Sequence, residues 1–412
     1  MTTYNKPNNS SALIKWLTYL MFMMFAMTTD AVGEIIKEVM KQFSLSMTAA
    51  GLLHYGPMTA IALGGILLGF LADKFGRKKT IIIGLSLFAI NSFLFLLGNT
   101  FSFFLSLLII SGFAIGIFKT AALALIGDIT NSTKEHTSTM NLVEGFFGVG
   151  AIVGTFFVSY LVSKGIDWKY LYVFAATLCL ILIGLALSVT YPETKKVTDQ
   201  KSGLRSTIKM TKDYYALGFS LSAFLYVAVE SAIYVWMPTL LANYTGDFIL
   251  AATYSLSIFF ILRAAGRFLG AYIMSRYNWT WALTLFSAAI FICFIGSIVG
   301  KIEWAVILLP LSGLFMSVIY PTINSKGISC FPKAQHGAAA GIILFFTAAG
   351  AAFGPLSMGA LSDSMGGNAL AGFSLATLYA GVLFFGTLFN AIFDPTKIRL
   401  EKLNNSEYTL RD

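Results

Sequence analysis

The sequence predicts an all-α integral membrane protein with twelve transmembrane helices in two pseudo-symmetric six-helix bundles. Three features of the 412-residue chain predict this fold class: its composition, its long apolar segments and an internal duplication. Hydrophobic residues make up 57% of the chain and charged residues 11%, whereas soluble domains have roughly 45–50% and 25%. The mean hydropathy of +0.77 agrees with this. A lipid bilayer is the environment that accommodates so much apolar surface.

Twelve apolar segments are long enough to cross a bilayer, since roughly 20 helical residues span a hydrocarbon core of about 30 Å. Lipid offers the backbone no hydrogen-bond partners, so segments this long and uniformly apolar are expected to be helices. In the first half they lie near residues 13–33, 48–71, 80–97, 103–127, 138–163 and 169–190. In the second half they lie near residues 215–240, 249–274, 280–299, 304–326, 337–361 and 369–393.

The two halves of the sequence repeat each other at an offset of 200 to 201 residues. Matches in separate segments at one shift indicate a duplicated unit of about half the chain. The matched positions are Gly65 and Gly69 with Gly266 and Gly270, Gly112 with Gly313, Gly150 and Gly154 with Gly350 and Gly354, and Asp30 with Glu230. Glycines at this spacing in a membrane helix predict close helix packing.

The duplication predicts four parts of the chain. They are an N-terminal six-helix bundle over 1–190, a cytoplasmic linker over 191–214, a C-terminal six-helix bundle over 215–393 and a cytoplasmic tail over 394–412. The tails and even-numbered loops carry about 19 basic residues and the odd-numbered loops about five, so the positive-inside rule places both termini in the cytoplasm. We therefore expect a multi-pass protein of the cell inner (plasma) membrane.

The net charge of +9 is, on this interpretation, mainly a topology signal. It also favours contact with anionic membrane lipids and does not indicate nucleic-acid binding. The three cysteines and three histidines show no paired spacing, so neither a disulfide framework nor a metal site is expected. His54 is a weak candidate for a cavity role. The sequence offers no nucleophile and no cofactor-binding loop, so we expect that the protein is not an enzyme and binds no cofactor. We also expect it to be a monomer.

Five ionisable residues lie inside apolar segments: Asp30, Lys119, Glu144, Glu230 and Arg263. Each costs about 2.5–3.5 kcal/mol on insertion scales, so it normally faces a cavity or a charged partner. Similar depth predicts ion pairs between Lys119 and Glu144 and between Glu230 and Arg263. Such pairs can be purely structural, but in a duplicated bundle the midplane is where solute and coupling ions bind. The sequence therefore predicts a membrane transporter in which these charges share one chamber.

The loop after the second predicted helix carries the motif GFLADKFGRKK, from Gly69 to Lys79. A carboxylate beside a cluster of bases forms charge-assisted contacts that hold helix ends together, so the motif predicts a gate contact. A solvated basic loop would explain the bases but not Gly69, Asp73 and Gly76 at their positions. The motif resembles the signature of the major facilitator superfamily, with Lys74 in place of the usual Arg. The predicted gating residues are Gly69, Asp73, Gly76, Arg77 and Lys78.

Three segments resemble the fucose/proton symporter group of that superfamily. They are Asn141–Ala151, Phe224–Trp236 and Phe315–Ile328, the last with Tyr320-Pro321-Thr322 as its most recognisable part. The resemblance implies the major facilitator fold, and it implies proton symport of a neutral hexose or related polyol. The chain departs from the group at several charged positions. Lys119 stands where the group has a functional glutamate, and Glu144 and Glu230 stand where it has glutamines. The acidic residue of the group's first helix aligns with Gly33 or Glu34 of this chain.

Because of these departures, proton coupling is argued from this chain's own carboxylates. A carboxylate that exchanges a basic partner for a proton can drive alternating access; the candidates are Asp30, Glu34, Glu144 and Glu230. The predicted substrate-binding residues for a small polar solute, taken to be a sugar or sugar-like compound, are Lys119, Glu144, Glu230, Arg263, Tyr320, Asn141, Asn324, Tyr55, Phe146 and Tyr226.

Other functions stay open from the sequence alone. Two central cations, Lys119 and Arg263, suit a sugar acid or other organic anion better than a neutral polyol. Drug or metabolite efflux by proton antiport is a further alternative within the same superfamily. A transport-inactive sensor would need a signalling domain, for which residues 191–214 and 394–412 are too short.

Overall fold

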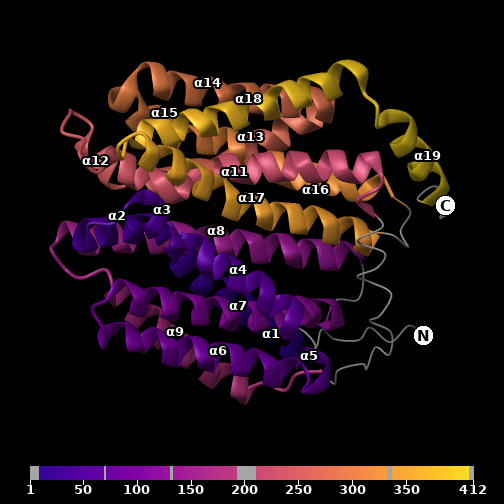
Figure 1. Ribbon diagram of the computed structural model, residues 1–412. Coiled ribbons are helices and arrows are strands. Elements are labelled where there is room, and N and C mark those ends of the chain that lie inside the picture. The colour runs from indigo at the N-terminus through magenta and orange to yellow at the C-terminus, as the bar shows by residue number, and fades with distance from the viewer. Residues whose placement is uncertain (1–8, 69–70, 130–132, 193–209, 332–335, 408–412) are drawn as a thin grey trace, which may run out of the picture. The chain divides into compact units, whose positions relative to one another are not determined.

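The computed structural model describes residues 9–68, 71–129, 133–192, 210–331 and 336–407, and these residues are almost entirely helical (Figure 1). The chain forms two compact units. Unit 1 comprises Met1–Ser44 and Leu52–Val197, and unit 2 comprises Leu45–Gly51 and Thr198–Asp412. The predicted fold class of twelve transmembrane helices in two bundles is confirmed. The cytoplasmic placement of the linker and the tail stays a prediction.

Unit 1 builds its six membrane segments from nine helical elements. They are α1 (Asn9–Thr29), α2 (Val32–Phe43), α4 (Leu52–Leu68), α5 (Leu71–Lys74), α6 (Arg77–Phe93), the short 3-10 helix η1 (Leu94–Leu96), α7 (Phe101–Ile129), α8 (Thr133–Ser163) and α9 (Tyr170–Ser188). The pair α1–α2 makes one segment. Aromatic rings fill the core, where Phe25 lies 4.8 Å from Phe88 and 4.6 Å from Phe118 between ring centroids.

Unit 2 repeats the plan with broken helices. Its elements are α3 (Met47–Ala50), α11 (Tyr214–Leu241), α12 (Ile249–Thr253), α13 (Ser255–Arg276), α14 (Trp279–Val299), α15 (Lys301–Met316), α16 (Ile319–Ser329), α17 (His336–Ser364), α18 (Ala369–Phe393) and α19 (Lys397–Glu407). The pairs α12–α13 and α15–α16 each make one segment, and α14 packs beside α15 and α18 (Figure 1).

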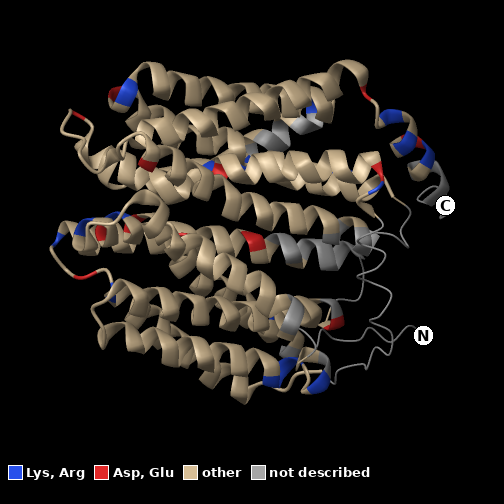
Figure 2. Ribbon diagram, viewed as in Figure 1, with Lys and Arg blue, Asp and Glu red and all other residues tan. Residues whose placement is uncertain are grey.

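Ten of the described helical segments are long and apolar enough to cross a membrane. The other two of the twelve are α4 and α13. The described part of α4 has only 17 residues, and α13 carries Arg263 and Arg267 within its apolar stretch. Most of the helical surface is uncharged, and charged residues gather near helix ends (Figure 2). The few charges inside the helices are therefore the exceptions that need an explanation.

The duplicated glycines pack one helix against another in each unit. In unit 1, a Cβ at Gly154 of α8 would collide with the Met27 carbonyl of α1. In unit 2, a Cβ at Gly354 of α17 would lie 2.7 Å from Cα of Ala228 on α11. Real side chains essentially never approach this closely, so both helix pairs require glycine here. The prediction that this spacing marks close packing is confirmed at these two positions.

A short segment of the first sequence half belongs to unit 2. Ser46 caps the N-terminus of α3, and the Asp363 carboxylate near the end of α17 accepts hydrogen bonds from the N–H groups of Met47 and Thr48, each at 2.9 Å. These N–H groups have no partner within α3, because the first turn of a helix leaves its donors unsatisfied. A Cβ at Gly359 would lie 3.2 Å from the Thr48 nitrogen. The absence of a side chain at this position therefore permits the close approach.

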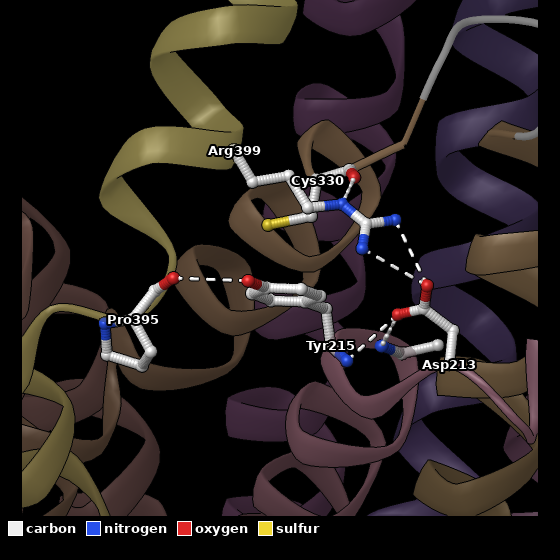
Figure 3. A network of polar contacts seen from close by, with 6 residues as sticks. Asp213, Tyr215, Cys330, Pro395 and Arg399 are labelled. Atoms are coloured by element: carbon white, nitrogen blue, oxygen red, sulfur yellow. Dashed lines mark hydrogen bonds and ion pairs between the residues drawn. The ribbon is translucent and has the colours of Figure 1, made fainter.

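The C-terminal helix α19 is fixed to unit 2 by Arg399 (Figure 3). Its guanidinium donates to Asp213 Oδ2 at 3.1 Å and to the Cys330 carbonyl at 2.7 Å. It also stacks on the Tyr215 ring at 4.4 Å, and the Tyr215 hydroxyl donates to the Pro395 carbonyl at 3.3 Å. Asp213 caps α11 through the N–H of Tyr215. One arginine thus joins the beginning of α11, the end of α16 and the beginning of α19.

Candidate substrate and proton site

Glu230 and Arg263 form an ion pair inside unit 2. Nη2 of Arg263, on α13, lies 2.6 Å from Oε1 of Glu230, on α11. The side chain of Glu230 is only 9% exposed, whereas that of Arg263 is 25% exposed. A buried carboxylate that is ionised needs such a partner, because an uncompensated buried charge is strongly destabilising. The ion pair that the sequence predicts is therefore present, and its cation is more accessible than its anion.

Tyr226 connects this pair to a third helix. Its hydroxyl lies 3.1 Å from Oε1 of Glu230 and 2.8 Å from the carbonyl of Met316, the last residue of α15. A phenol has a single proton to donate, so it cannot serve both acceptors at full strength while Glu230 is ionised. The ring of Tyr226 is buried and stacks with the ring of Tyr320 at 6.2 Å. Tyr226 thus contacts both sides of the gap between α15 and α16.

The gap itself follows from Pro321. This residue has no N–H to donate to the Ser317 carbonyl, and its ring disfavours a continuous helix at that point. The helix therefore stops at Met316 and begins again at Ile319. Carbonyls at the end of α15 become available to side chains such as Tyr226. Asn324, a predicted substrate residue, lies half-buried on α16 beyond the break.

Arg267 is a charged residue of this site that the sequence interpretation missed. It lies four residues after Arg263 on α13, is exposed, and interacts electrostatically with Tyr226. Residues four apart on a helix lie on the same face. That spacing was visible in the sequence and could have identified Arg267 together with Arg263.

Unit 1 contains a cluster of one cation and two carboxylates. Lys119, on α7, interacts electrostatically with Glu144, on α8, and with Asp30, between α1 and α2. Its ammonium lies 5.0 Å from the ring centroid of Phe147. Asp30 accepts a hydrogen bond from the Thr29 hydroxyl at 3.1 Å. Among the described residues, Lys119 and Glu144 interact electrostatically but do not form the close ion pair that the sequence predicts, and Glu144 is the exposed member of the three charges.

Glu34 has a separate, local partner. Its carboxylate is 1% exposed, and Oε2 lies 2.7 Å from Nζ of Lys37, one turn later on α2.

The remaining predicted aromatic residues of unit 1 are in packed positions. Tyr55 is buried on α4, and Phe146 packs against the rings of Tyr19 and Trp16 with centroid distances of 5.4 Å and 5.6 Å. Packing therefore accounts for these two residues.

A small cavity of about 20 Å³ lies in unit 1 near the break between α1 and α2. Its lining includes Thr28, Thr29, His54 and Tyr172, and it has room for about one water molecule.

The side chain of Asn141 lies outside the described residues. Among the described residues, no three His, Cys, Asp or Glu side chains gather as metal ligands.

The basic motif before α6 makes fixed contacts where the structure describes it. Nε of Arg77 lies 3.0 Å from Asp128 Oδ2 at the end of α7. Lys78 donates to the carbonyls of Leu187 and Val189 at 2.9 Å and 2.7 Å, and its ammonium lies 5.5 Å from the ring of Tyr191. Burial raises the pKa of this tyrosine to about 12. These contacts hold the beginning of α6 against the ends of α7 and α9.

Two other motif residues fall outside what can be described. Gly69 and the side chain of Asp73 lie outside the described residues. Gly76 has φ of +85°, a backbone conformation that glycine adopts without strain. The conformation explains why glycine precedes the bases, whereas the role of the motif as a gate stays a prediction.

The model of the Major Facilitator Superfamily matches residues 18–355 of this chain. The chain belongs to the Major Facilitator Superfamily. Membership in this superfamily makes it a multi-pass membrane transporter rather than an enzyme. The predicted resemblance of the basic motif to the superfamily signature is confirmed at the level of the family.

Individual members of the superfamily are distant from this chain. The cis,cis-muconate transport protein of Acinetobacter baylyi is 23% identical over 380 residues, which cover 87% of this chain and 90% of that protein. The quinolone resistance protein NorA of Staphylococcus aureus is 25% identical over 353 residues, covering 80% and 84%. The crystal structure of the E. coli fucose:proton symporter FucP has a TM-score of 0.64 at 21% identity, covering 93% and 99%. That structural likeness shows the shared fold.

Proposed function

We propose that this chain is a secondary active transporter that moves a small polar solute, a sugar or sugar-like compound, by alternating access with proton symport. We place it in the cell inner (plasma) membrane with both termini cytoplasmic. The observation that carries the proposal is the Glu230–Arg263 ion pair at 2.6 Å inside an apolar helical unit. The similarity to the FucP fold and to the muconate transport protein supports a small organic solute.

Glu230 is the proton carrier in this proposal. When its carboxylate takes a proton it becomes neutral, so its attraction to Arg263 is lost and the guanidinium can bind solute. A protonated carboxyl also gains a donor. Glu230 then donates to the Tyr226 oxygen, and Tyr226 donates its own proton fully to the Met316 carbonyl at the helix break. Protonation thereby changes contacts on α11, α13 and α15 together.

The charges of unit 1 provide a second site of the same kind. Lys119 has two carboxylate neighbours, Asp30 and Glu144, so one of them can take a proton while the other continues to balance the ammonium. Asp30 corresponds to Glu230 in the internal repeat. We propose that Asp30 or Glu144 supports coupling and that Glu34, held by Lys37, has the smaller part. The expectation that both clusters share one chamber stays a prediction.

The test uses purified protein in liposomes with an imposed pH gradient. Wild-type protein is screened with neutral sugars, sugar acids and lipophilic cations. For the solute that accumulates, Glu230→Gln should abolish the dependence on the pH gradient, because glutamine cannot carry the proton. Glu303→Gln, at an exposed acidic residue in the first turn of α15, is the matched control and should leave it unchanged.

The same assay examines the other carriers and the alternative directions of coupling. Proton-driven uptake that persists in Glu230→Gln but disappears in Glu144→Gln or Asp30→Asn would move the carrier to unit 1. Expulsion of a lipophilic cation in exchange for protons would replace symport with efflux. Accumulation that ignores the pH gradient in wild-type protein would remove proton coupling from the proposal.

A further inference from the structure

A cavity of about 540 Å³ lies within unit 2 at the ends of its membrane helices. Its walls are the beginning of α14, the end of α16, the residue after α18 and one face of α19. On α19, Lys397, Leu400 and Glu401 are three and four residues apart and so share that face, whereas Arg399 binds the Cys330 carbonyl at the end of α16. Sites for small ligands have volumes of about 300–1,000 Å³, so this cavity is large enough to hold one.

The cavity has charged side chains of both signs in its lining. Those among the described residues are Lys326, Lys397, Asp394 and Glu401. The ammonium of Lys326 lies 5.7 Å from the ring centroid of Trp279. Within the described part of the chain, no ion pair joins either lysine to either carboxylate. The cavity therefore presents two cations and two anions to a ligand that itself carries both charges.

Exposed apolar side chains lie directly before Asp394 in the last turns of α18. Phe389, Ile392 and Phe393 are 57%, 59% and 67% exposed, and residues three and four apart lie on the same face of a helix. In a bilayer, acyl chains cover such a surface, and tryptophan side chains such as Trp279 lie at the level of the headgroups. A lipid whose chains contact the end of α18 therefore has its headgroup at the cavity.

We propose that this cavity binds the headgroup of a phospholipid that carries both a phosphate and a primary ammonium. Lys326 and Lys397 donate charge-assisted hydrogen bonds to the phosphate. Asp394 and Glu401 accept hydrogen bonds from the ammonium, which has three N–H groups to donate. The bound lipid thereby joins α16, α18 and α19, and its binding does not depend on how transport is coupled.

Other headgroups fit these side chains less well. An anionic headgroup without an ammonium brings its phosphate close to two carboxylates that it cannot neutralise. A trimethylated ammonium keeps the positive charge but has no N–H to donate to a carboxylate. A soluble phosphate ester lacks the acyl chains that contact the end of α18.

The experiment compares lipids that differ only in the headgroup. Short-chain phosphatidylethanolamine, phosphatidylcholine and phosphatidylglycerol are titrated into full-length protein that has been purified in detergent and freed of lipid. Binding is measured by native mass spectrometry and by the shift in melting temperature. We expect phosphatidylethanolamine to bind roughly 3-fold to 10-fold more tightly than the other two, as the contacts of two partly exposed carboxylates imply. Soluble phosphoethanolamine should bind more weakly than the lipid.

Two variants on α19 separate the contacts of the phosphate from those of the ammonium. Lys397→Gln should weaken phosphatidylethanolamine and phosphatidylglycerol alike, by roughly 2-fold to 5-fold. Glu401→Gln should weaken phosphatidylethanolamine by a similar factor without weakening phosphatidylglycerol. Both residues are exposed, and so is Lys402, the next residue of the helix. Lys402→Gln is the matched control and should bind as wild type does. Circular dichroism and gel filtration establish that each variant is folded.

Each result supports or overturns the proposal. Selective binding of phosphatidylethanolamine that Glu401→Gln removes and Lys402→Gln retains would support it. Equal binding of the three lipids, no binding of any, or wild-type selectivity in both folded cavity variants would overturn it. Tighter binding of phosphatidylglycerol would reject the contact with an ammonium, and binding of phosphoethanolamine as tight as that of the lipid would assign the cavity to a soluble phosphate ester instead.

Discussion

Replacing Arg263 by glutamine should destabilise the protein because it leaves the Glu230 carboxylate buried without its cation. Removal of one partner of a buried ion pair typically costs about 3–5 kcal/mol. We expect the lower end, about 3 kcal/mol, because the Arg263 side chain is 25% exposed and solvent already screens part of the interaction. The Tyr226 hydroxyl also remains beside Glu230 and stabilises the lone carboxylate.

A double-mutant cycle isolates the interaction between these two residues. The free energy of unfolding is measured by titration with SDS in mixed micelles for Arg263→Gln, Glu230→Gln and the double variant. The double variant should lose less than Arg263→Gln alone, because it leaves no unpaired charge, and a coupling energy of about 2 kcal/mol is expected. Arg276→Gln serves as the surface control. A coupling energy below about 0.5 kcal/mol would refute the view that this pair is buried and mutually dependent.

Two further predictions concern packing and helix docking. Gly154→Leu should destabilise unit 1 by roughly 1–3 kcal/mol or more, measured as a lower free energy of unfolding, because its side chain would displace α1. Arg399→Ala should lower the free energy of unfolding by roughly 1–2 kcal/mol through its lost bonds to half-exposed partners, and it should speed proteolysis of α19.

Matched controls give each of these predictions a point of failure. Gly184→Leu extends into open space and should change stability by less than about 0.5 kcal/mol; an equal loss at both glycines would contradict the packing argument. Lys402→Ala, at an exposed position of α19, should leave proteolysis unchanged.

The sequence was sufficient for the fold and for the ion pair of unit 2. Charged residues in apolar segments need partners, and equal depth in adjacent helices was enough to pair Glu230 with Arg263. The same reasoning paired Lys119 with Glu144 but missed its interaction with Asp30. Asp30 lies in a break between α1 and α2, and no proline or glycine at positions 30–31 indicates that break in the sequence. A break in a helix changes which side chains share a depth.

Other features required coordinates. Pro321 was visible in the sequence, but the partner of the Met316 carbonyl was not, because Tyr226 lies 90 residues away. The contact of Asp363 with the N-terminus of α3 joins residues 316 positions apart through backbone N–H groups, which have no signature in the sequence. Arg267 is different, since its spacing from Arg263 was available and was overlooked.

The central claim, that Glu230 exchanges Arg263 for a proton during transport, is tested most directly by counting protons with a pH-sensitive dye inside liposomes. Addition of the solute that accumulates in the liposome screen outside wild-type proteoliposomes should acidify the interior, and Glu230→Gln should take up or exchange that solute without acidification. Acidification by the Glu230→Gln variant equal to that of wild type would contradict the account.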